Sequence, residues 1–314
     1  MKIHFQQKKR QGQRGYALML VLAVIAILIV IVAGLAEVTQ YSWIDSKYER
    51  SRFHAKLLAE SGSAVAMHPN VQAGDPALRK DFGDGRSYEV RITTEGGRIL
   101  INSIDDQIIL ETVQELFIRW GVDASTAAIA AESLADWMDD DRETRTNGAE
   151  SEFYATLNFP EYPLNRPFTS LEEMLLVRGM DQVARINPLW RDYFTLHSDG
   201  LIDVNSAPGD LLEAFFQISP DSAREFEQAR NGGDGIVGTE DDYVFENEDE
   251  VRAVLGLSND EWERVNPNVT LENTLRRIES VGRIAEFEYK LIILAEVSGE
   301  GRNEEVTPVA RISE

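Results

Sequence analysis

Cysteine is absent from this chain of 314 residues, and basic residues are scarce compared with acidic ones. The lack of cysteine excludes disulfide bonds, thiolate metal ligands and thiol nucleophiles, although it does not assign the protein to a compartment. Lysine and arginine total 31 against 54 aspartate and glutamate residues, which gives a formal net charge of −23. A chain this acidic repels phosphate backbones, so we expect no nucleic-acid partner.

Hydrophobic residues make up 43% of the chain, which is enough to build packed cores and excludes wholesale disorder. The length allows about two domains by the usual size of roughly 150 residues each. The composition therefore indicates a folded protein with room for more than one domain.

Charged residues are also missing from one long stretch near the N-terminus. No residue between Tyr16 and Ala36 is charged, and the first acidic residue is Glu37. At about 1.5 Å per residue, a helix of this length spans roughly 30 Å, the thickness of a bilayer core. The residues that precede it include five basic ones, Lys2, Lys8, Lys9, Arg10 and Arg14. Because basic flanks stay in the cytoplasm, we predict a single-pass inner-membrane protein with its C-terminal domain in the periplasm.

The residues leave three interpretations of this segment open. A secretory signal could be cleaved at Gly34-Leu35-Ala36, but such signals have shorter apolar cores of about 7–15 residues. An uncleaved anchor explains the hydrophobicity and the orientation equally well. The third interpretation depends on Gly15, which ends a basic leader directly before the apolar run. This junction resembles a type IV prepilin leader, which implies cleavage after Gly15 and a mature chain beginning at Tyr16, where such families usually have Phe or Met.

The residues after the apolar run predict that the helix continues well beyond the membrane. No proline occurs between Tyr16 and Met67, and Pro69 with Asn70 provides a stop. After residue 36 the pattern becomes amphipathic, with one face repeating at helical spacings. That face comprises Tyr41, Ile44, Tyr48, Ala55, Leu58, Gly62 and Val65. A single helix of this length would extend roughly 75–80 Å, whereas a break near Gly34 would leave an anchor and a separate helix.

The remainder of the chain predicts a small sheet interrupted by a helical insert. Alternation at 88–93, a turn at 95–97 and the segment 98–102 indicate a hairpin, and a second pair of strands is expected at 277–282 and 287–293. Helix signals fill the residues between them. They are an apolar stripe (Ile109, Val113, Leu116, Phe117, Trp120), capping boxes at Ser170–Glu173 and Ser258–Glu261, and caps at Asn205 or Ser206 and at Ser219.

We therefore predict an α+β fold, in which a pilin-like long N-terminal helix packs on a small antiparallel sheet and a large all-α domain is inserted between strands. The expected boundaries are a cleaved leader at 1–15, the transmembrane and assembly helix at 16–68, the first part of the sheet at 69–104, the insert at 105–272 and the closing strands at 273–314.

Several strings in the insert, taken in order, resemble one family. They are Asp136-Trp137-Met138-Asp139-Asp140-Asp141, then Gly148-Ala149-Glu150 with Tyr154, then Leu164-Asn165-Arg166-Pro167-Phe168 with 172–179, and Leu201-Ile202-Asp203-Val204-Asn205-Ser206-Ala207-Pro208. Together they resemble the K-type minor pseudopilin of the bacterial type II secretion system, over nearly the whole chain. Most pseudopilins carry Glu at the fifth mature position, and the K type lacks it; here that position is Leu20. An unpaired carboxylate is costly in lipid. A subunit that has no other subunit ahead of it therefore gains nothing by keeping this glutamate.

The resemblance implies a non-enzymatic subunit at the tip of the secretion pseudopilus, which helps to initiate pseudopilus assembly and protein export across the outer membrane. It implies I-type and J-type minor pseudopilins, the prepilin peptidase, the inner membrane and the secretion platform as partners, and methylation of the new amino terminus. The alternative is a single-pass, membrane-anchored, calcium-dependent periplasmic hydrolase or binding protein. Catalysis has little support, because the chain contains neither an HExxH string nor a GxSxG elbow.

A glycine-rich acidic segment at 231–242 is the best candidate for a binding site. Its glycines formally match a dinucleotide fingerprint, but no strand precedes them and the neighbouring carboxylates would repel a pyrophosphate. Calcium takes about 6–8 oxygen ligands, which such a loop can largely supply. K-type pseudopilins have an insert that binds calcium, so the resemblance implies the same ion here in a structural role. The expected ligands are Asp234, Glu240, Asp241 and Asp242, supported by Thr239 and the Ile236 carbonyl; a solvated acidic turn is the alternative.

A second acidic cluster is a weaker candidate for metal binding. The cluster comprises Asp139, Asp141, Glu143 and Glu150, whose spacing is faintly like a calcium loop, but Thr144 stands where an EF-hand needs glycine. The Asn205 turn resembles those that open DNA-binding helix-hairpin-helix modules. Because acidic residues surround it, we predict that it has a folding role.

Overall fold

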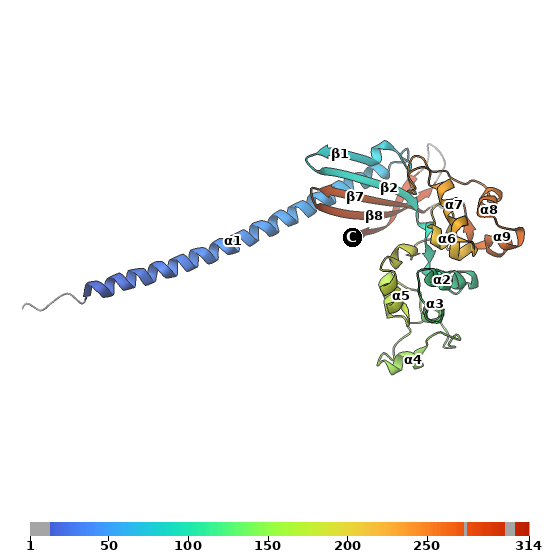
Figure 1. The fold of residues 1–314 in the computed structure, drawn as a ribbon, viewed down its shortest axis with the longest axis horizontal. Helices are drawn as coiled ribbons and strands as arrows, with labels where there is room; N and C mark the ends of the chain where they lie inside the picture. The colour runs from blue at the N-terminus through green and yellow to red at the C-terminus, as the bar shows by residue number, and fades with distance from the viewer. Residues whose placement is uncertain (1–12, 273–274, 299–304, 314) are drawn as a thin grey trace, which may run out of the picture.

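The computed structural model describes residues 13–272, 275–298 and 305–313, and its longest element is the N-terminal helix (Figure 1). This helix, α1, runs over 54 residues from Gln13 to Ala66 without a break at Gly34, which confirms the prediction of one continuous helix. Residues 1–12, with four of the five basic leader residues, lie outside the described residues. The helix ends shortly before Pro69, as predicted.

A five-stranded antiparallel sheet, in the order β1-β2-β7-β8-β9, packs against the C-terminal part of α1. Its strands are β1 Arg79–Gly83, β2 Arg86–Thr94, β7 Leu275–Ile284, β8 Phe287–Ser298 and β9 Glu305–Ser313. The predicted closing pair is confirmed, because β7 and β8 are antiparallel with Ile278 opposite Ile293. Strands β2 and β7 are neighbours although they are far apart in the sequence, so the residues between them form an insert. The α+β class is likewise confirmed.

The predicted hairpin between 88–93 and 98–102 is wrong. Strand β2 pairs with β1 on one side and β7 on the other, so neither of its edges is available to residues 98–102. Instead, β3 Ile99–Leu100 leaves the sheet and pairs in parallel with β4 Phe194–Thr195. The intended turn is a 3-10 helix, Glu95–Gly97, in which the buried Glu95 accepts a hydrogen bond from Arg277 at 2.9 Å. This buried ion pair ties the start of the insert to β7.

Small residues let α1 lie directly on the sheet. Gly282 has no side chain at the closest approach, where a β-carbon would lie 2.0 Å from the Ala55 carbonyl oxygen. Ser280 Oγ donates to the Ala59 carbonyl oxygen at 2.7 Å. The buried face of α1 comprises Ala55, Ala59, Gly62, Ser63 and Ala66.

The predicted face of α1 agrees with the buried one only in part. Ala55 and Gly62 are buried, whereas Leu58 and Val65 are half-buried at its margins. Tyr48 is 55% exposed, although its ring meets the Phe287 ring edge-on at 4.8 Å. Tyr41 and Ile44 lie outside the described side chains. The narrow, small-residue contact at Gly282 therefore decides which turns of α1 are covered.

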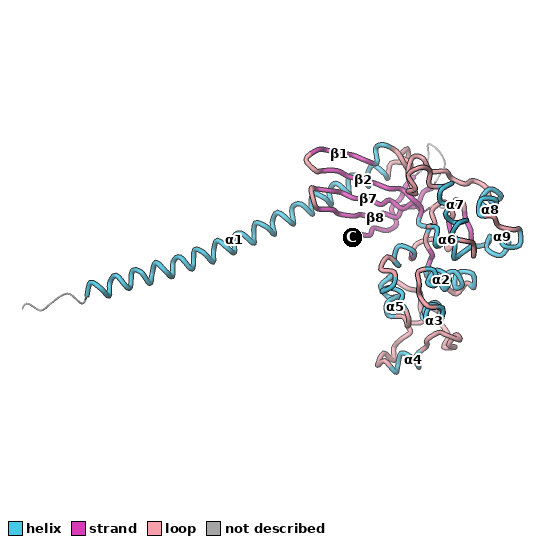
Figure 2. Tube along the Cα trace, viewed as in Figure 1, coloured by secondary structure: helices cyan, strands magenta, loops and turns pink. Residues whose placement is uncertain are grey.

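The insert is mainly helical and lies at the end of the sheet remote from the free end of α1 (Figures 1 and 2). Its helices are α2 Gln107–Arg119, α3 Ala124–Met138, α4 Ser151–Thr156, α5 Met180–Ile186, α6 Gly209–Phe216, α7 Pro220–Arg230, α8 Glu248–Leu255 and α9 Asn259–Val265. Two short parallel pairs accompany them, β3–β4 and β5 Ile202–Asp203 with β6 Val269–Thr270. Ile109, Val113, Leu116 and Phe117 are buried as the stripe predicted. A shared core that includes Trp137, Trp190 and Phe215 holds the insert together.

The predicted helix caps had mixed outcomes. The Ser258–Glu261 capping box and the Ser219 cap are both present. At Ser170 the box does not form: the Ser170 hydroxyl caps a 3-10 helix (Leu171–Leu176) by accepting from the Glu172 N–H, and the Glu173 carboxylate binds Thr169 and Arg166 instead of the cap backbone. The N-cap of α6 is Pro208, which makes no side-chain hydrogen bond, and the Gly209 N–H donates instead to the Glu227 carboxylate at 2.8 Å. The prediction of Asn205 or Ser206 in that role is therefore wrong.

Candidate functional site

The exposed half of α1 is the first functional feature. Tyr16–Gly34 has a mean hydropathy of 3.3, none of it is buried, and it is the one helical segment in the described residues long and apolar enough to cross a membrane. Leu20 is 67% exposed within it. An uncovered apolar surface of this size requires lipid or other helices around it. The segment therefore fits a single-pass anchor.

The glycine-rich segment forms a compact loop, residues 231–247, between α7 and α8. Asp241 Oδ2 accepts hydrogen bonds from the backbone N–H groups of Gly233 and Asp234 at 2.6 and 3.3 Å. Asp242 Oδ2 accepts from Gly238 and Thr239 at 2.5 and 3.3 Å. Hydrogen bonds from the Gly233 backbone and then the Thr239 side chain lower the pKa of Asp241, so its carboxylate is charged at neutral pH.

Several oxygen atoms of the loop converge on the Thr239 hydroxyl. Thr239 Oγ1 lies 3.0 Å from the Ile236 carbonyl oxygen, 3.0 Å from Asp241 Oδ1 and 3.3 Å from Asp242 Oδ1. Carboxylate, hydroxyl and carbonyl oxygens are the ligands that calcium prefers. The structure thus brings together four of the six predicted ligands, and this donor set fits calcium.

The other two predicted ligands lie differently. Asp234 Oδ1 accepts from its own loop at Ile236 N, at 2.7 Å. Glu240 lies with its backbone against Gly74, where a β-carbon would be 2.5 Å from both its N and its Cα. In the described residues no three Asp, Glu or His side chains come close enough to hold a metal by themselves. A metal in this loop would therefore need its backbone and hydroxyl oxygens.

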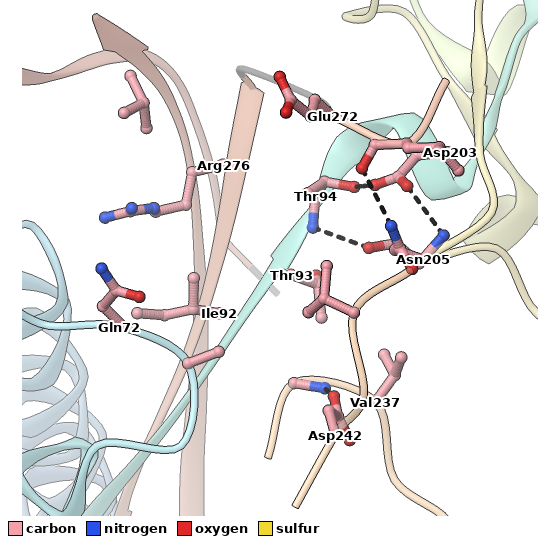
Figure 3. A pocket seen from close by; sticks show the side chains of 16 residues that line it. Gln72, Ile92, Thr93, Thr94, Asp203, Asn205, Val237, Asp242, Glu272 and Arg276 are labelled. Atoms are coloured by element: carbon pink, nitrogen blue, oxygen red, sulfur yellow. Dashed lines mark hydrogen bonds between the residues drawn. The ribbon is translucent and has the colours of Figure 1, made fainter. Parts of the chain in front are cut away.

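The glycine loop also lies at the boundary between the insert and the pilin-like body, which comprises α1 and the five-stranded sheet. Gly238, at φ +87°, packs on β2, where a β-carbon would lie 2.7 Å from the Ile92 carbonyl oxygen. Gly74, which follows α1, packs on Glu240 as described above. A pocket of about 470 Å³ opens beside this contact and is lined by Ile92, Asp203, Val237 and Arg276 among others (Figure 3). The loop thus contacts the insert, the sheet and the segment after α1.

The Asn205 turn has the folding role that its sequence predicted. Its side chain binds the backbone of Phe245 through both its oxygen and its nitrogen, at 2.9 and 3.0 Å, and its nitrogen also donates to the Leu271 carbonyl at 3.0 Å. Asp203, directly before the turn, accepts from Thr94 of β2 and from the Asn205 backbone N–H (Figure 3). Burial raises the pKa of Asp203.

Sequence reasoning missed Arg230, which links this turn to the glycine loop. Arg230 is 2% exposed, and its Nη1 donates to the carbonyl oxygens of Val204 and Ala207 at 2.7 and 2.6 Å. Its Nε donates to Asn231 Oδ1 at 2.7 Å. A single arginine among many polar residues carries no sequence signal of this kind, because its partners are backbone atoms from a distant segment.

The second acidic cluster lies at the C-terminal end of α3. Asp136 is fully buried, and Arg145 Nη1 bridges it to Asp139 at 2.8 and 2.5 Å. Asp141 uses its carboxylate to accept from the backbone N–H of Glu143 at 2.7 Å. Glu150 is 3% exposed, and burial raises its pKa to about 7. The predicted residues Asp139, Asp141 and Glu150 thus share one loop, with an arginine among them.

Comparisons with known proteins agree on one system. The family model described as type II secretion system protein K matches residues 98–189. Type II secretion system protein K of Pseudomonas aeruginosa is 26% identical over 259 residues, which cover 74% of this chain and 76% of that protein. The protein of the same name from Klebsiella pneumoniae is 26% identical over 247 residues, covering 69% and 75%.

A solved structure has the same fold. A chain from the crystal structure of the GspK–GspI–GspJ complex of the enterotoxigenic Escherichia coli type 2 secretion system superimposes with a TM-score of 0.59. The match covers 87% of this chain and 99% of that chain at 17% identity.

A long helix that is apolar in its N-terminal part and packs its C-terminal part on a small antiparallel sheet is a pilin-like arrangement. The large helical insert between two neighbouring strands distinguishes this subunit from a plain pilin body. The chain is similar in sequence to type II secretion system protein K, whose family model matches residues 98–189, and similar in fold to a chain of the GspK–GspI–GspJ complex.

Proposed function

We propose that this chain caps the tip of the type II secretion pseudopilus and has no enzymatic activity. The observation that carries the proposal is the pairing of an acid-free apolar helix, with Leu20 at its fifth mature position, with a bulky insert at the opposite end of the molecule (Figure 1). A subunit without the membrane carboxylate has no contact to offer a subunit ahead of it. An insert that projects beside the sheet does not repeat easily along a thin fibre.

The apolar helix and the bulky insert suggest how the protein is processed, placed and assembled. The leader at 1–15 is removed by a prepilin peptidase, the new amino terminus at Tyr16 is methylated, and the helix at 16–68 remains in the inner membrane. The sheet segments at 69–104 and 273–314, with the insert at 105–272, lie in the periplasm. The partners are an I-type and a J-type minor pseudopilin, a proposal supported by the solved complex that contains a chain of this fold. The tip complex helps to initiate assembly on the secretion platform, and the pseudopilus then drives export across the outer membrane.

Processing at Gly15 tests this function. Intact-mass measurement of protein purified from cells with a prepilin peptidase should place the first residue at Tyr16. Gly15→Leu should block cleavage and secretion, because the peptidase must accept a residue with no side chain at this position, whereas Gly34→Leu should leave cleavage unchanged. A first residue at Met1 would instead favour a plain anchor, and one at Glu37 a secreted hydrolase or binding protein.

The same proposal includes a structural calcium ion in the glycine loop. Thr239, Asp241, Asp242 and the Ile236 carbonyl would hold it, and Asp234 and Glu240 are the further ligands that the sequence predicts. A bound cation would supply charge balance and stiffness to a loop that also touches Gly74 and β2. Its role is therefore to brace the insert against the pilin-like body, in a chain without disulfides.

Calcium removal tests the loop. A ligand held at 100 times its dissociation constant stabilises a protein by about 2.7 kcal/mol. We therefore expect chelation to lower the melting temperature of the wild type by several degrees. Asp234→Ala with Asp241→Ala should remove at least half of this shift. Asp249→Ala with Asp260→Ala, which deletes the same charge from the exposed first turns of α8 and α9, should retain it. A loop variant that responds to chelator as the wild type does would place the ion elsewhere.

A further inference from the structure

The loop that follows α3 is organised around one buried carboxylate. Asp136 is 0% exposed and accepts from the backbone N–H of Arg145 at 3.2 Å and from its Nη1 at 2.8 Å. Gly148 is packed so closely on it that a β-carbon would lie 1.9 Å from Asp136 Oδ2. Residues 139–150 therefore wrap around the end of α3, which leaves Glu150 close enough to Asp136 and Asp139 for their charges to act on its carboxyl group.

Three oxygen atoms of this region are buried and have no hydrogen-bond partner among the described residues. They are Asp139 Oδ1, Glu150 Oε1 and Asn165 Oδ1. Asn165 belongs to this region because its Nδ2 donates to the Asp141 carbonyl oxygen at 2.7 Å. Glu150 is 3% exposed, so bulk water cannot satisfy its free oxygen. Buried acceptors without donors are costly and uncommon in folded proteins.

The charges of the region are also unbalanced. Asp136, Asp139 and Glu150 contribute three acidic groups, and Arg145 is the one cation that pairs with any of them in the described residues. Arg145 Nη1 is already shared between Asp136 and Asp139, and in the part of the chain that the structure describes Arg145 forms no ion pair with Glu150. An excess of buried negative charge is strongly unfavourable unless a counter-charge is present.

We propose that Asp139, Glu150 and Asn165 hold a second divalent cation, of the calcium class, at the end of α3. Two carboxylates and an amide oxygen, next to the Asp141 carbonyl, are the hard ligands that such an ion requires. The ion would satisfy the three free oxygens and balance the charge that Arg145 leaves. Asn165 lies outside the acidic segment 139–150 in the sequence and joins the site only through the fold. The site is independent of the glycine loop and does not rest on the ion proposed there.

Calcium stoichiometry of the full chain in detergent, titrated with CaCl2 alone, tests the second site. In the Asp234→Ala and Asp241→Ala background, which removes the glycine-loop site, we expect one calcium ion still to bind. Adding Glu150→Gln to that background should weaken this binding at least tenfold. The control is Glu152→Gln, an exposed glutamate two residues away on α4, which should leave the affinity unchanged.

Asn165→Ala provides a second variant that leaves the buried carboxylates intact, and it should weaken calcium binding in the same background at least tenfold. Terbium offers a separate readout, because Trp137 is the neighbouring indole: sensitised emission should appear in the background variant and fall on Trp137→Phe. Absence of residual calcium binding in the background variant would overturn the proposal, as would an affinity unaffected by both Glu150→Gln and Asn165→Ala. In either case a buried water, to which the unpartnered Trp137 N–H could donate, would fill the space. If only the glycine-loop ion were lost, the one calcium ion expected at the end of α3 would still bind.

Discussion

Gly282→Ala is expected to detach the N-terminal helix from the sheet. The added methyl group would lie 2.0 Å from the Ala55 carbonyl oxygen and 2.5 Å from Ala59 N, and both are backbone atoms of α1 that cannot rotate away. The helix would have to move off β7, which would also break the bond from Ser280 Oγ to the Ala59 carbonyl. Overpacking costs about 1–3 kcal/mol and occasionally more, and we expect the upper end of that range here.

The measurement is chemical denaturation of the full chain in detergent, together with proteolysis at the basic residues of α1 between Lys47 and Lys56. The variant should unfold at lower denaturant concentration and be cut faster in this segment. Gly34→Ala is the matched control, because it makes the same change in open space within α1. Equal stability and equal cleavage of the two variants would show that α1 does not need close contact with β7. A detached helix should also impair secretion, since the sheet and the insert would no longer be held in a fixed position relative to α1.

Arg230→Met should have an effect of similar size on the seam between insert and sheet. The substitution keeps much of the aliphatic volume but removes the donors to Val204, Ala207 and Asn231. It also removes the nearby positive charge from the buried Asp203. Removing one partner of a buried charged network costs about 3–5 kcal/mol, because polar groups are left buried and unpaired.

Thermal unfolding of the full chain would measure this loss of stability. Calcium titration would report whether the calcium affinity of the glycine loop falls with it. We expect both to change, since Asn231 begins the loop. Arg224→Met is the control on the same helix: Arg224 is exposed and pairs only with the exposed Asp221, so its loss should stay within about 0.5 kcal/mol. If the two methionine variants were equally stable, Arg230 would not hold the Asn205 turn to α7.

Features that depend on neighbouring residues were the ones that could be predicted. The Ser258–Glu261 box formed because both partners lie within one helical turn and no other group competes for them. The Ser170–Glu173 box did not form because Arg166 and Thr169 bind the same glutamate and the Ser170 hydroxyl accepts from Glu172 instead. The strand at 88–93 could be recognised from its alternation, but its partner could not. Pairing with β7 depends on residues from the other end of the chain.

The candidate site divides along the same line. Glycine and aspartate in the segment 231–242 were enough to predict a tight, oxygen-rich loop. The convergence of Asp241 and Asp242 on Thr239, and the outward place of Glu240 against Gly74, depend on how that loop packs. Asn165 could not be assigned to the second acidic loop, because only the folded chain places it beside the Asp141 carbonyl.

The sequence by itself determined the long apolar helix, the acidic character of the residues that follow it, the α+β class and the resemblance to K-type pseudopilins. These properties follow from composition, periodicity and short motifs, whose physical causes act between residues close together in the chain. Only the tertiary structure decided the partner of β2, the contact of Gly282 with α1, the role of Arg230 and which residues surround Glu150. Each of these depends on burial beside a segment distant in sequence, where close packing and unpaired charge determine which contacts are possible.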